Sequence, residues 1–208
     1  MWIKICGVTT VEDALLASES GADAVGVNLV PSSPRCATRE LARGMARALP
    51  ESVPVVAVVA DLTVSSLEQL RTECSIRWLQ LHGAETPETL ACLLPDAYKA
   101  VRIGGAPDVR AAELFAGELL LADAKVAGKL GGSGVAFDWS LVTDLARRRK
   151  VVLAGGLHAG NVADAIRRAR PWGVDVASGV EQDGDPRRKD PDKLRRFVAA
   201  ARRAAEDE

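Results

Sequence analysis

The chain has 208 residues, of which 48% are hydrophobic and 4% aromatic, and 27 Lys and Arg against 28 Asp and Glu give a formal net charge of -1. This composition predicts a globular protein and argues against a disordered chain. It also argues against nucleic acid as a partner, because there is no global positive field and there are few aromatic side chains to stack on bases. Short basic runs, such as residues 187–189, are offset by acidic neighbours.

Two further absences in the sequence limit where the protein acts. No apolar run approaches the roughly 18 residues that a membrane span needs, and no signal-like segment stands at the start. We therefore expect a cytoplasmic protein with no membrane contact. The cysteines at positions 6, 36, 74 and 92 include no CxxC pair, so neither a zinc site nor a redox dithiol is indicated.

Short apolar or β-branched runs alternate with helix-like stretches along the chain. The expected strands span residues 2–6, 23–30, 54–60, 77–83, 97–103, 118–123, 151–156 and 173–179, and a helix-like stretch follows each of them. Strict alternation predicts a parallel sheet, since parallel strands need long crossovers. Eight such units, with no GxGxxG turn after the first strand, favour an α/β fold of the closed (β/α)8 TIM barrel type, with residues 1–208 as a single domain.

In a barrel of this kind the active site lies at the carboxyl ends of the strands. The polar and small residues found there are Cys6, Asn28, Arg35, Asp61, His82, Arg102, Asp123, Gly155, Gly156, Ser178 and Gly179. Cys6, at the end of the first strand, has two interpretations. It is either a small core hydrophobe or a reactive thiol at the rim of a site.

Two glycine-containing runs, LAGGL (153–157) and ASGVE (177–181), close the last two expected strands. Many barrels bind a phosphate group at this position on backbone N–H groups, which glycine lets an oxyanion approach closely. Gly155, Gly156, Ser178 and Gly179 thus predict a site for a phosphorylated small molecule; alternatively, the glycine pair only turns the chain. The run GKLGGSG (128–134) is interpreted as a mobile lid or a plain linker.

Several short runs stand in an order and spacing that match one known family. They are KICGVT (4–9), GADAVGV (21–27), SPR (33–35), QLHG (80–83), GGSGVAFDW (131–139), LAGGL with Asn161-Val162, and GVDVASGVE (173–181). In these runs the chain resembles the phosphoribosylanthranilate isomerases, barrel enzymes of tryptophan biosynthesis. The resemblance extends over essentially the whole sequence.

The resemblance implies an Amadori rearrangement that converts N-(5-phosphoribosyl)anthranilate into its 1-amino-1-deoxyribulose 5-phosphate, with no cofactor and no metal. It implies Cys6 as general base, Asp123 as general acid, Arg35 as the partner of the anthranilate carboxylate, and the glycines with Ser178 as the phosphate site. These residue types suit proton transfer and carboxylate binding. A free thiol with a pKa of ~8.5 is mostly protonated at pH 7, so Cys6 needs positive potential nearby.

Two polar groups near the expected centre have alternative roles. If Cys6 faces inward, so does Lys4, because inward positions alternate along a barrel strand. Lys4 is then expected to pair with Asp175, either to orient ribose hydroxyls and favour the Cys6 thiolate or as a purely structural ion pair. His82, one of two histidines, is expected to contact the substrate or to make a structural hydrogen bond.

Three features depart from the family pattern, and other functions remain as alternatives. Asn28 stands where an apolar or aromatic residue is usual, residues 182–190 are long for a compact turn, and DAKVAGKL (123–130) is unusual. One alternative is the sister aminosugar-phosphate isomerase of histidine biosynthesis, in which a carboxylate is expected in place of Cys6. Another is a non-catalytic phosphosugar-binding barrel, which would need neither Cys6 nor Asp123. Both a monomer and a homodimer fit the sequence.

Overall fold

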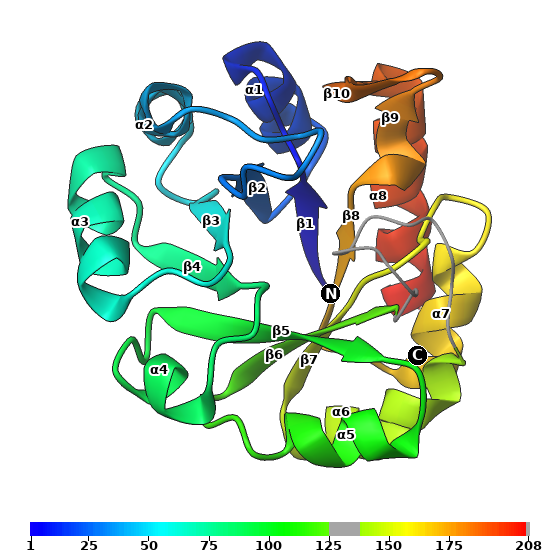
Figure 1. The fold of residues 1–208 in the computed structure, drawn as a ribbon. Coiled ribbons are helices and arrows are strands. Elements are labelled where there is room, and N and C mark those ends of the chain that lie inside the picture. Colours follow the sequence, from blue (N-terminus) through cyan, green and yellow to red (C-terminus); the bar gives the residue numbers. More distant parts are fainter. Residues whose placement is uncertain (125–137, 207–208) are drawn as a thin grey trace.

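The computed structural model describes residues 1–124 and 138–206. Eight strands, joined in parallel pairs, close into a barrel in the order β1 to β8, with helices arranged around the ring of strands (Figure 1). The strands are β1 (Trp2–Cys6), β2 (Ala24–Asn28), β3 (Val55–Val59), β4 (Trp78–Leu81), β5 (Ala97–Ile103), β6 (Leu119–Ala124), β7 (Lys150–Leu153) and β8 (Gly173–Val176). The expected (β/α)8 TIM barrel is confirmed.

Helices follow the strands as the alternation predicts. They are α1 (Val11–Glu19), α2 (Arg39–Ala48), α3 (Val64–Cys74), α4 (Pro87–Ala91), α5 (Ala106–Ala112), the 3₁₀ turn η1 (Trp139–Val142), α6 (Thr143–Arg148), α7 (Val162–Ala169) and α8 (Pro191–Glu206). The first four begin after threonines that accept a hydrogen bond from the third helical N–H: Thr10, Thr38, Thr63 and Thr86. This capping satisfies backbone donors that would otherwise lack a partner.

Several strands end a few residues earlier than expected, as β2 and β7 do, and two other segments differ in kind from the sequence-based expectation. The last barrel strand ends at Val176, and residues Ser178–Val180 form the 3₁₀ turn η2. Residues 182–190, expected to be a loop, contribute to an antiparallel hairpin of β9 (Glu181–Gln182) and β10 (Asp185–Lys189). Its charged sequence has no apolar alternation, so periodicity could not indicate these strands. The proposed lid or linker, residues 128–134, lies outside the described residues.

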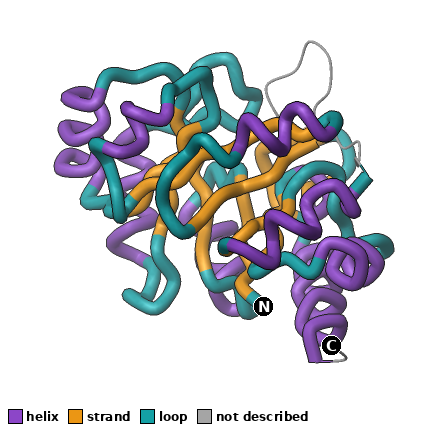
Figure 2. The backbone as a smooth tube through the Cα atoms, turned by 90° about the horizontal axis from the view of Figure 1, so that it is seen from below, coloured by secondary structure: helices purple, strands orange, loops and turns teal. Residues whose placement is uncertain are grey.

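The apolar core has two layers, one inside the barrel and one between the strands and the helices. The inner layer comprises Ala24, Val56, Tyr98, Ala100, Leu121, Val152 and Ala154. Trp2, Trp78 and Leu119, at the amino ends of their strands, pack against this layer. Figure 2 shows the strands enclosed by helices. The amino end of the barrel is therefore filled by apolar side chains, and the polar groups gather toward the carboxyl end.

The pairing of β1 with β8 closes the barrel and sets the positions of the central charged groups. In this register Lys4 lies opposite Asp175, while on the other edge of β1 Cys6 lies opposite Gly26. Lys4 Nζ donates to Asp175 Oδ2 at 2.7 Å, and the Lys4 side chain is fully buried. The expected pair of Lys4 with Asp175 is thus confirmed.

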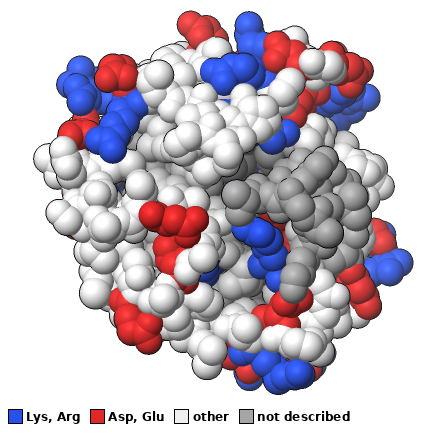
Figure 3. Space-filling model, viewed as in Figure 1, with Lys and Arg blue, Asp and Glu red and all other residues white. Residues whose placement is uncertain are grey.

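The surface agrees with the balanced composition. On the face seen in Figure 3, basic and acidic side chains lie interspersed around the rim. Within residues 1–124 and 138–206, no helix combines the length and the apolar character that a membrane crossing requires.

Candidate active site

A cavity of about 490 Å³ opens at the carboxyl ends of the barrel strands, a size typical of small-molecule sites. Of the predicted site residues it is lined by Cys6, Arg35, His82, Asp123, Gly155, Gly156, Asp175 and Ser178. Asn28 also lines it, whereas Gly179, Asp61 and Arg102 do not. The topology therefore brings together residues from both ends of the sequence.

Cys6 lies on β1 beside Lys4, and Gly26 of β2 makes room for both side chains. A Cβ atom at Gly26 would lie 2.8 Å from Cys6 Sγ and 2.9 Å from Lys4 Cε. Burial raises the pKa of the Cys6 thiol, the Asp175 charge raises it further, and the ammonium groups of Lys4 and Lys189 act in the opposite direction. The positive potential expected near Cys6 is present, but it does not outweigh burial in the ligand-free protein.

Asp175 uses only one of its carboxylate oxygens within the protein. Oδ2 accepts from Lys4, whereas Oδ1 is buried and has no hydrogen-bond partner among the described residues. Burial alone would lower the pKa of Lys4, but the charges of Asp175 and Cys6 and the Tyr98 hydroxyl raise it above its ordinary value, so Lys4 stays protonated. Because Asp175 lines the cavity, its free oxygen is available to accept from a ligand hydroxyl.

Asp123 and His82 lie next to each other at the cavity. Asp123 lies within β6, where its Oδ1 accepts from the N–H of Ala124 at 2.8 Å. Its Oδ2 lies 3.4 Å from Nε2 of His82. On the other side of the imidazole ring, Nδ1 of His82 lies 3.0 Å from Nε2 of Gln80.

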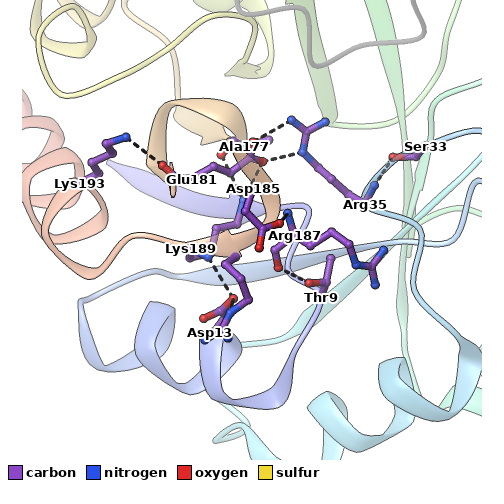
Figure 4. A network of polar contacts seen from close by, with 11 residues as sticks. Thr9, Asp13, Ser33, Arg35, Ala177, Glu181, Asp185, Arg187, Lys189 and Lys193 are labelled. Atoms are coloured by element: carbon purple, nitrogen blue, oxygen red, sulfur yellow. Dashed lines mark hydrogen bonds and ion pairs between the residues drawn. The ribbon is translucent and has the colours of Figure 1, made fainter. Parts of the chain in front are cut away.

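Arg35 reaches the cavity from the loop after β2, but it already holds a carboxylate of the chain. Its Nε and Nη2 donate to Glu181 at 2.5 and 2.9 Å, and this contact raises the Arg35 pKa above its ordinary value. The third guanidinium nitrogen points away from Glu181 (Figure 4). Lys189 Nζ donates to Glu181 at 3.3 Å, so one buried carboxylate joins two cations.

The glycines after β7 have conformations and contacts that a side chain would disturb. Gly155 and Gly156 have φ values of 87° and 64°, and a Cβ at Gly155 would lie 2.6 Å from the Ala124 nitrogen. Gly179 packs against the same loop, since its Cβ would lie 2.0 Å from the Leu157 oxygen. Within the described ranges, no acceptor is bonded to the N–H groups of Gly155 and Gly156, and these donors lie at the cavity.

Comparison with known proteins identifies the family. The model of the N-(5'-phosphoribosyl)anthranilate isomerase family matches residues 3–200. The chain belongs to this family. A family member from Magnetococcus marinus is 40% identical over 202 residues, which cover 97% of this chain and 95% of that protein. One from Roseiflexus castenholzii is 43% identical and covers 99% of this chain and 100% of that protein.

Solved structures of the family have the same fold. The isomerase of Thermotoga maritima superposes with a TM-score of 0.88 at 36% identity, over 97% of this chain and 98% of that one. A family structure in complex with reduced 1-(o-carboxyphenylamino)-1-deoxyribulose 5-phosphate has a TM-score of 0.85 at 35% identity, over 97% and 98% of the two chains. This chain is accordingly an isomerase of tryptophan biosynthesis, as its motifs predict.

Sequence reasoning misses several residues that shape the family's site in this chain. Glu181 and Gln80 stand inside the motifs GVDVASGVE and QLHG, but the motifs by themselves give neither residue a role. In the sequence, Tyr98 has the pattern of a core aromatic residue. Only the strand register shows that it lies opposite Gln80. Lys189 gives no signal of its own, because its partners lie in other segments. Among the described residues, no group of three or more His, Cys, Asp and Glu side chains has the arrangement of a metal site.

Two of the three features that depart from the family pattern have structural roles. Asn28 Oδ1 accepts from the Val30 N–H at 2.9 Å and so shapes the loop that carries Arg35. The hairpin of β9 and β10 contacts that loop, since Arg187 Nη1 donates to the carbonyl oxygens of Pro34 and Cys36, each at 3.1 Å. The third, residues 123–130, lies almost entirely outside the described residues.

Proposed function

We propose that the chain performs the Amadori rearrangement of N-(5'-phosphoribosyl)anthranilate with Asp123 as general acid and Cys6 as general base. The observation that carries the proposal is that both side chains line one cavity, on β6 and β1, with the Gly155-Gly156 loop at the same cavity. A thiol and a carboxyl group around one ligand can act on different atoms of it. A barrel that only binds a phosphosugar needs neither group.

In the first step, Asp123 in its protonated form donates its proton to the furanose ring oxygen. The bond between C1 and that oxygen breaks, and the lone pair of the anthranilate nitrogen forms the C1–N double bond. The ring oxygen becomes a hydroxyl group, and the product is a cationic imine. A carboxyl group placed beside the ring oxygen can deliver its proton as that carbon–oxygen bond breaks, which is general acid catalysis.

In the second step, the Cys6 thiolate removes the proton from C2. The imine withdraws electrons from the neighbouring carbon and acidifies this proton. The electron pair released forms the C1–C2 double bond of an enolamine, while the π pair of the C1–N bond returns to nitrogen. Tautomerisation, in which C1 gains a proton and the C2 hydroxyl loses one, then yields the ketone. The positive imine also supplies the potential that the thiol lacks in the ligand-free protein, where burial raises the pKa of Cys6.

Other cavity residues are assigned to binding. The unpartnered Asp175 Oδ1 accepts from a ribose hydroxyl, and the Gly155 and Gly156 N–H groups with the Ser178 hydroxyl donate to the phosphate. Arg35, with two of its nitrogens held by Glu181, offers its third nitrogen to the anthranilate carboxylate. We further propose that the chain works in the cytoplasm as a monomer or homodimer, which light scattering on the purified protein would distinguish.

Substitution of the two proton-transfer groups tests the mechanism. We expect Cys6→Ala and Asp123→Asn each to lower kcat by about 10²–10⁴-fold, because each removes one proton-transfer group. Turnover is measured as loss of the fluorescence of the anthranilate substrate made in situ. Affinity for the reduced product analogue should change little, and Cys92→Ala, at an exposed cysteine, serves as control.

A near wild-type rate in either variant contradicts its assignment. Absence of turnover in the wild type, with the reduced product analogue still bound, would favour the phosphosugar-binding barrel. Turnover of the aminoimidazole substrate of histidine biosynthesis instead would favour the sister isomerase.

A further inference from the structure

A chain of hydrogen bonds runs through the barrel interior and ends at the cavity. Tyr98 on β5 and Gln80 on β4 are register partners, each about 1% exposed. Tyr98 Oη donates to Gln80 Oε1 at 3.0 Å. Gln80 Nε2 lies 3.0 Å from His82 Nδ1, and His82 Nε2 lies 3.4 Å from Asp123 Oδ2. Tyr98, Gln80 and His82 thus connect the buried core to the carboxylate of Asp123.

The Lys4 charge at the buried end determines which atoms donate in this series of hydrogen bonds. The Lys4 ammonium is close enough to Tyr98 to lower its pKa, although burial has the larger effect and raises the Tyr98 pKa overall. A cation attracts the lone pairs of the phenol oxygen and turns its O–H away, toward Gln80. The Gln80 amide then accepts with Oε1 and must present its N–H group to His82.

The donor from Gln80 determines where the imidazole carries its proton. A neutral imidazole has one N–H and one lone pair, and an Nδ1 that accepts from Gln80 requires the proton on Nε2. Asp123, at the other end of the hydrogen-bonded series, favours the same tautomer, because a carboxylate next to Nε2 favours an N–H over a lone pair.

The last donor of this series, at the cavity, lacks a hydrogen-bond partner. His82 Nε2 is buried and makes no hydrogen bond within the described residues, and His82 lines the cavity. At 3.4 Å the contact with Asp123 is too long to satisfy this donor well. A buried donor without a partner costs free energy, so its presence at a cavity indicates that a ligand atom completes it.

We propose that Tyr98 and Gln80 are positioning residues that hold His82 as its Nε2–H tautomer, so that this N–H donates to an acceptor oxygen of the bound ligand beside Asp123. The identity of the ligand rests on the proposed function. The tautomer does not, because it is a property of the free protein. His82 is in this way assigned a substrate contact, and its second ring nitrogen a structural hydrogen bond.

The tautomer can be read directly, since the chain has only two histidines. Long-range ¹⁵N–¹H correlation spectra of protein labelled with ¹⁵N-histidine show which ring nitrogen carries the proton. For the neutral ring of His82 we expect a protonated Nε2 and an unprotonated Nδ1. The exposed His158 accepts from the Gly160 N–H at its own Nδ1, and His158→Ala assigns the two sets of signals.

Two variants test whether Gln80 and Tyr98 set this state. Gln80→Glu offers His82 only acceptor atoms, so we expect the His82 ring to become protonated at Nδ1 and kcat/KM to fall about tenfold or more. Tyr98→Phe adds no charge and frees the amide to turn, which should yield a mixture of the two tautomers. Gln69→Glu, on the exposed side of α3, adds the same charge and should change neither the His82 tautomer nor kcat/KM.

The outcomes separate this inference from the proposed function. If His82 of the wild type carries its proton on Nδ1, the inference is wrong, even if the enzyme turns over its substrate. The inference is also wrong if the Gln80→Glu protein is folded and its His82 signals match those of the wild type. If the expected tautomer is found in a protein without turnover, the proposed function fails and the positioning role stands. Circular dichroism of each variant shows whether it is folded.

Discussion

Cys6 lies between opposing charges, and this environment governs the pH at which its thiol ionises. Burial and Asp175 raise the pKa of its thiol, while Lys4 and Lys189 counteract them. At neutral pH the ligand-free enzyme therefore holds mainly the thiol, the form that cannot accept a proton. Lys4 stays charged beside it, so the thiolate that forms at higher pH has a cation nearby.

This environment predicts the pH at which Cys6 ionises. Half of the Cys6 thiol should be ionised only at a pH above the ordinary thiol pKa of ~8.5, because burial and the Asp175 charge raise the pKa of Cys6. The measurement is titration of the thiolate by ultraviolet absorbance in wild type and Cys6→Ser. Their difference isolates Cys6 from the other three cysteines. A Cys6 thiolate already formed at pH 7 would contradict this prediction.

The hairpin of β9 and β10 positions a loop that belongs to another part of the barrel. Glu181, the first residue of β9, holds Arg35, and Arg187 of β10 donates to two carbonyl oxygens of the Arg35 loop. Thr9, in the loop after β1, donates in turn to the Arg187 carbonyl oxygen. These contacts are drawn in part in Figure 4. The long segment before α8 thus supports the loop of Arg35, a residue that lines the cavity.

Loss of this support should weaken substrate binding more than catalysis. Arg187→Ala removes two hydrogen bonds, worth roughly 1 kcal/mol each, and we expect KM to rise about threefold to tenfold with kcat nearly unchanged. Arg188→Ala removes the neighbouring arginine of the same strand, which contacts Asp13 instead, and should leave KM near the wild-type value. Equal effects of the two variants would show that the hairpin does not position the loop.

The whole barrel depends on contacts between its two ends. β1 pairs with β8, and α8 returns to the start of the chain, where Arg202 donates to the Met1 and Gly21 carbonyl oxygens and to Asp23 Oδ2. Asp23 Oδ2 also accepts from the Ile3 N–H at 2.7 Å. The last helix is therefore tied to the first strand by one arginine.

Removal of this tie should lower the stability of the molecule. Arg202 and Asp23 are about one-third exposed, so solvent weakens their attraction, and we expect Arg202→Ala to cost about 1 kcal/mol and to lower Tm by about 2–4 °C. Thermal unfolding followed by circular dichroism measures the change. Arg203→Ala, at the exposed neighbour, is the control. A variant with the same Tm as the wild type would mean that strand pairing alone holds the ends together.

The sequence by itself determined the barrel and the place of its site. Strand and helix periods are local properties, and in a parallel barrel all strands end on the same side. The positions of Cys6, Asp123 and the Gly155-Gly156 pair at strand ends were therefore enough to assign them to one cavity. The family motifs added the reaction. The pair of Lys4 and Asp175 followed from the alternation of inward positions and the pairing of the first strand with the last.

Only the tertiary structure decided which polar groups meet. Arg35 and Glu181 are 146 residues apart in the sequence, and Tyr98 and Gln80 are 18 apart. Neither separation follows from the repeat of a helix or a strand, so periodicity cannot predict these contacts. Their contacts depend on strand register, on the path of the loops and on a hairpin whose charged sequence carries no periodic signal. Local patterns encode the elements, whereas the partners of buried charges and amides are set by packing, which leaves each of them few groups within reach.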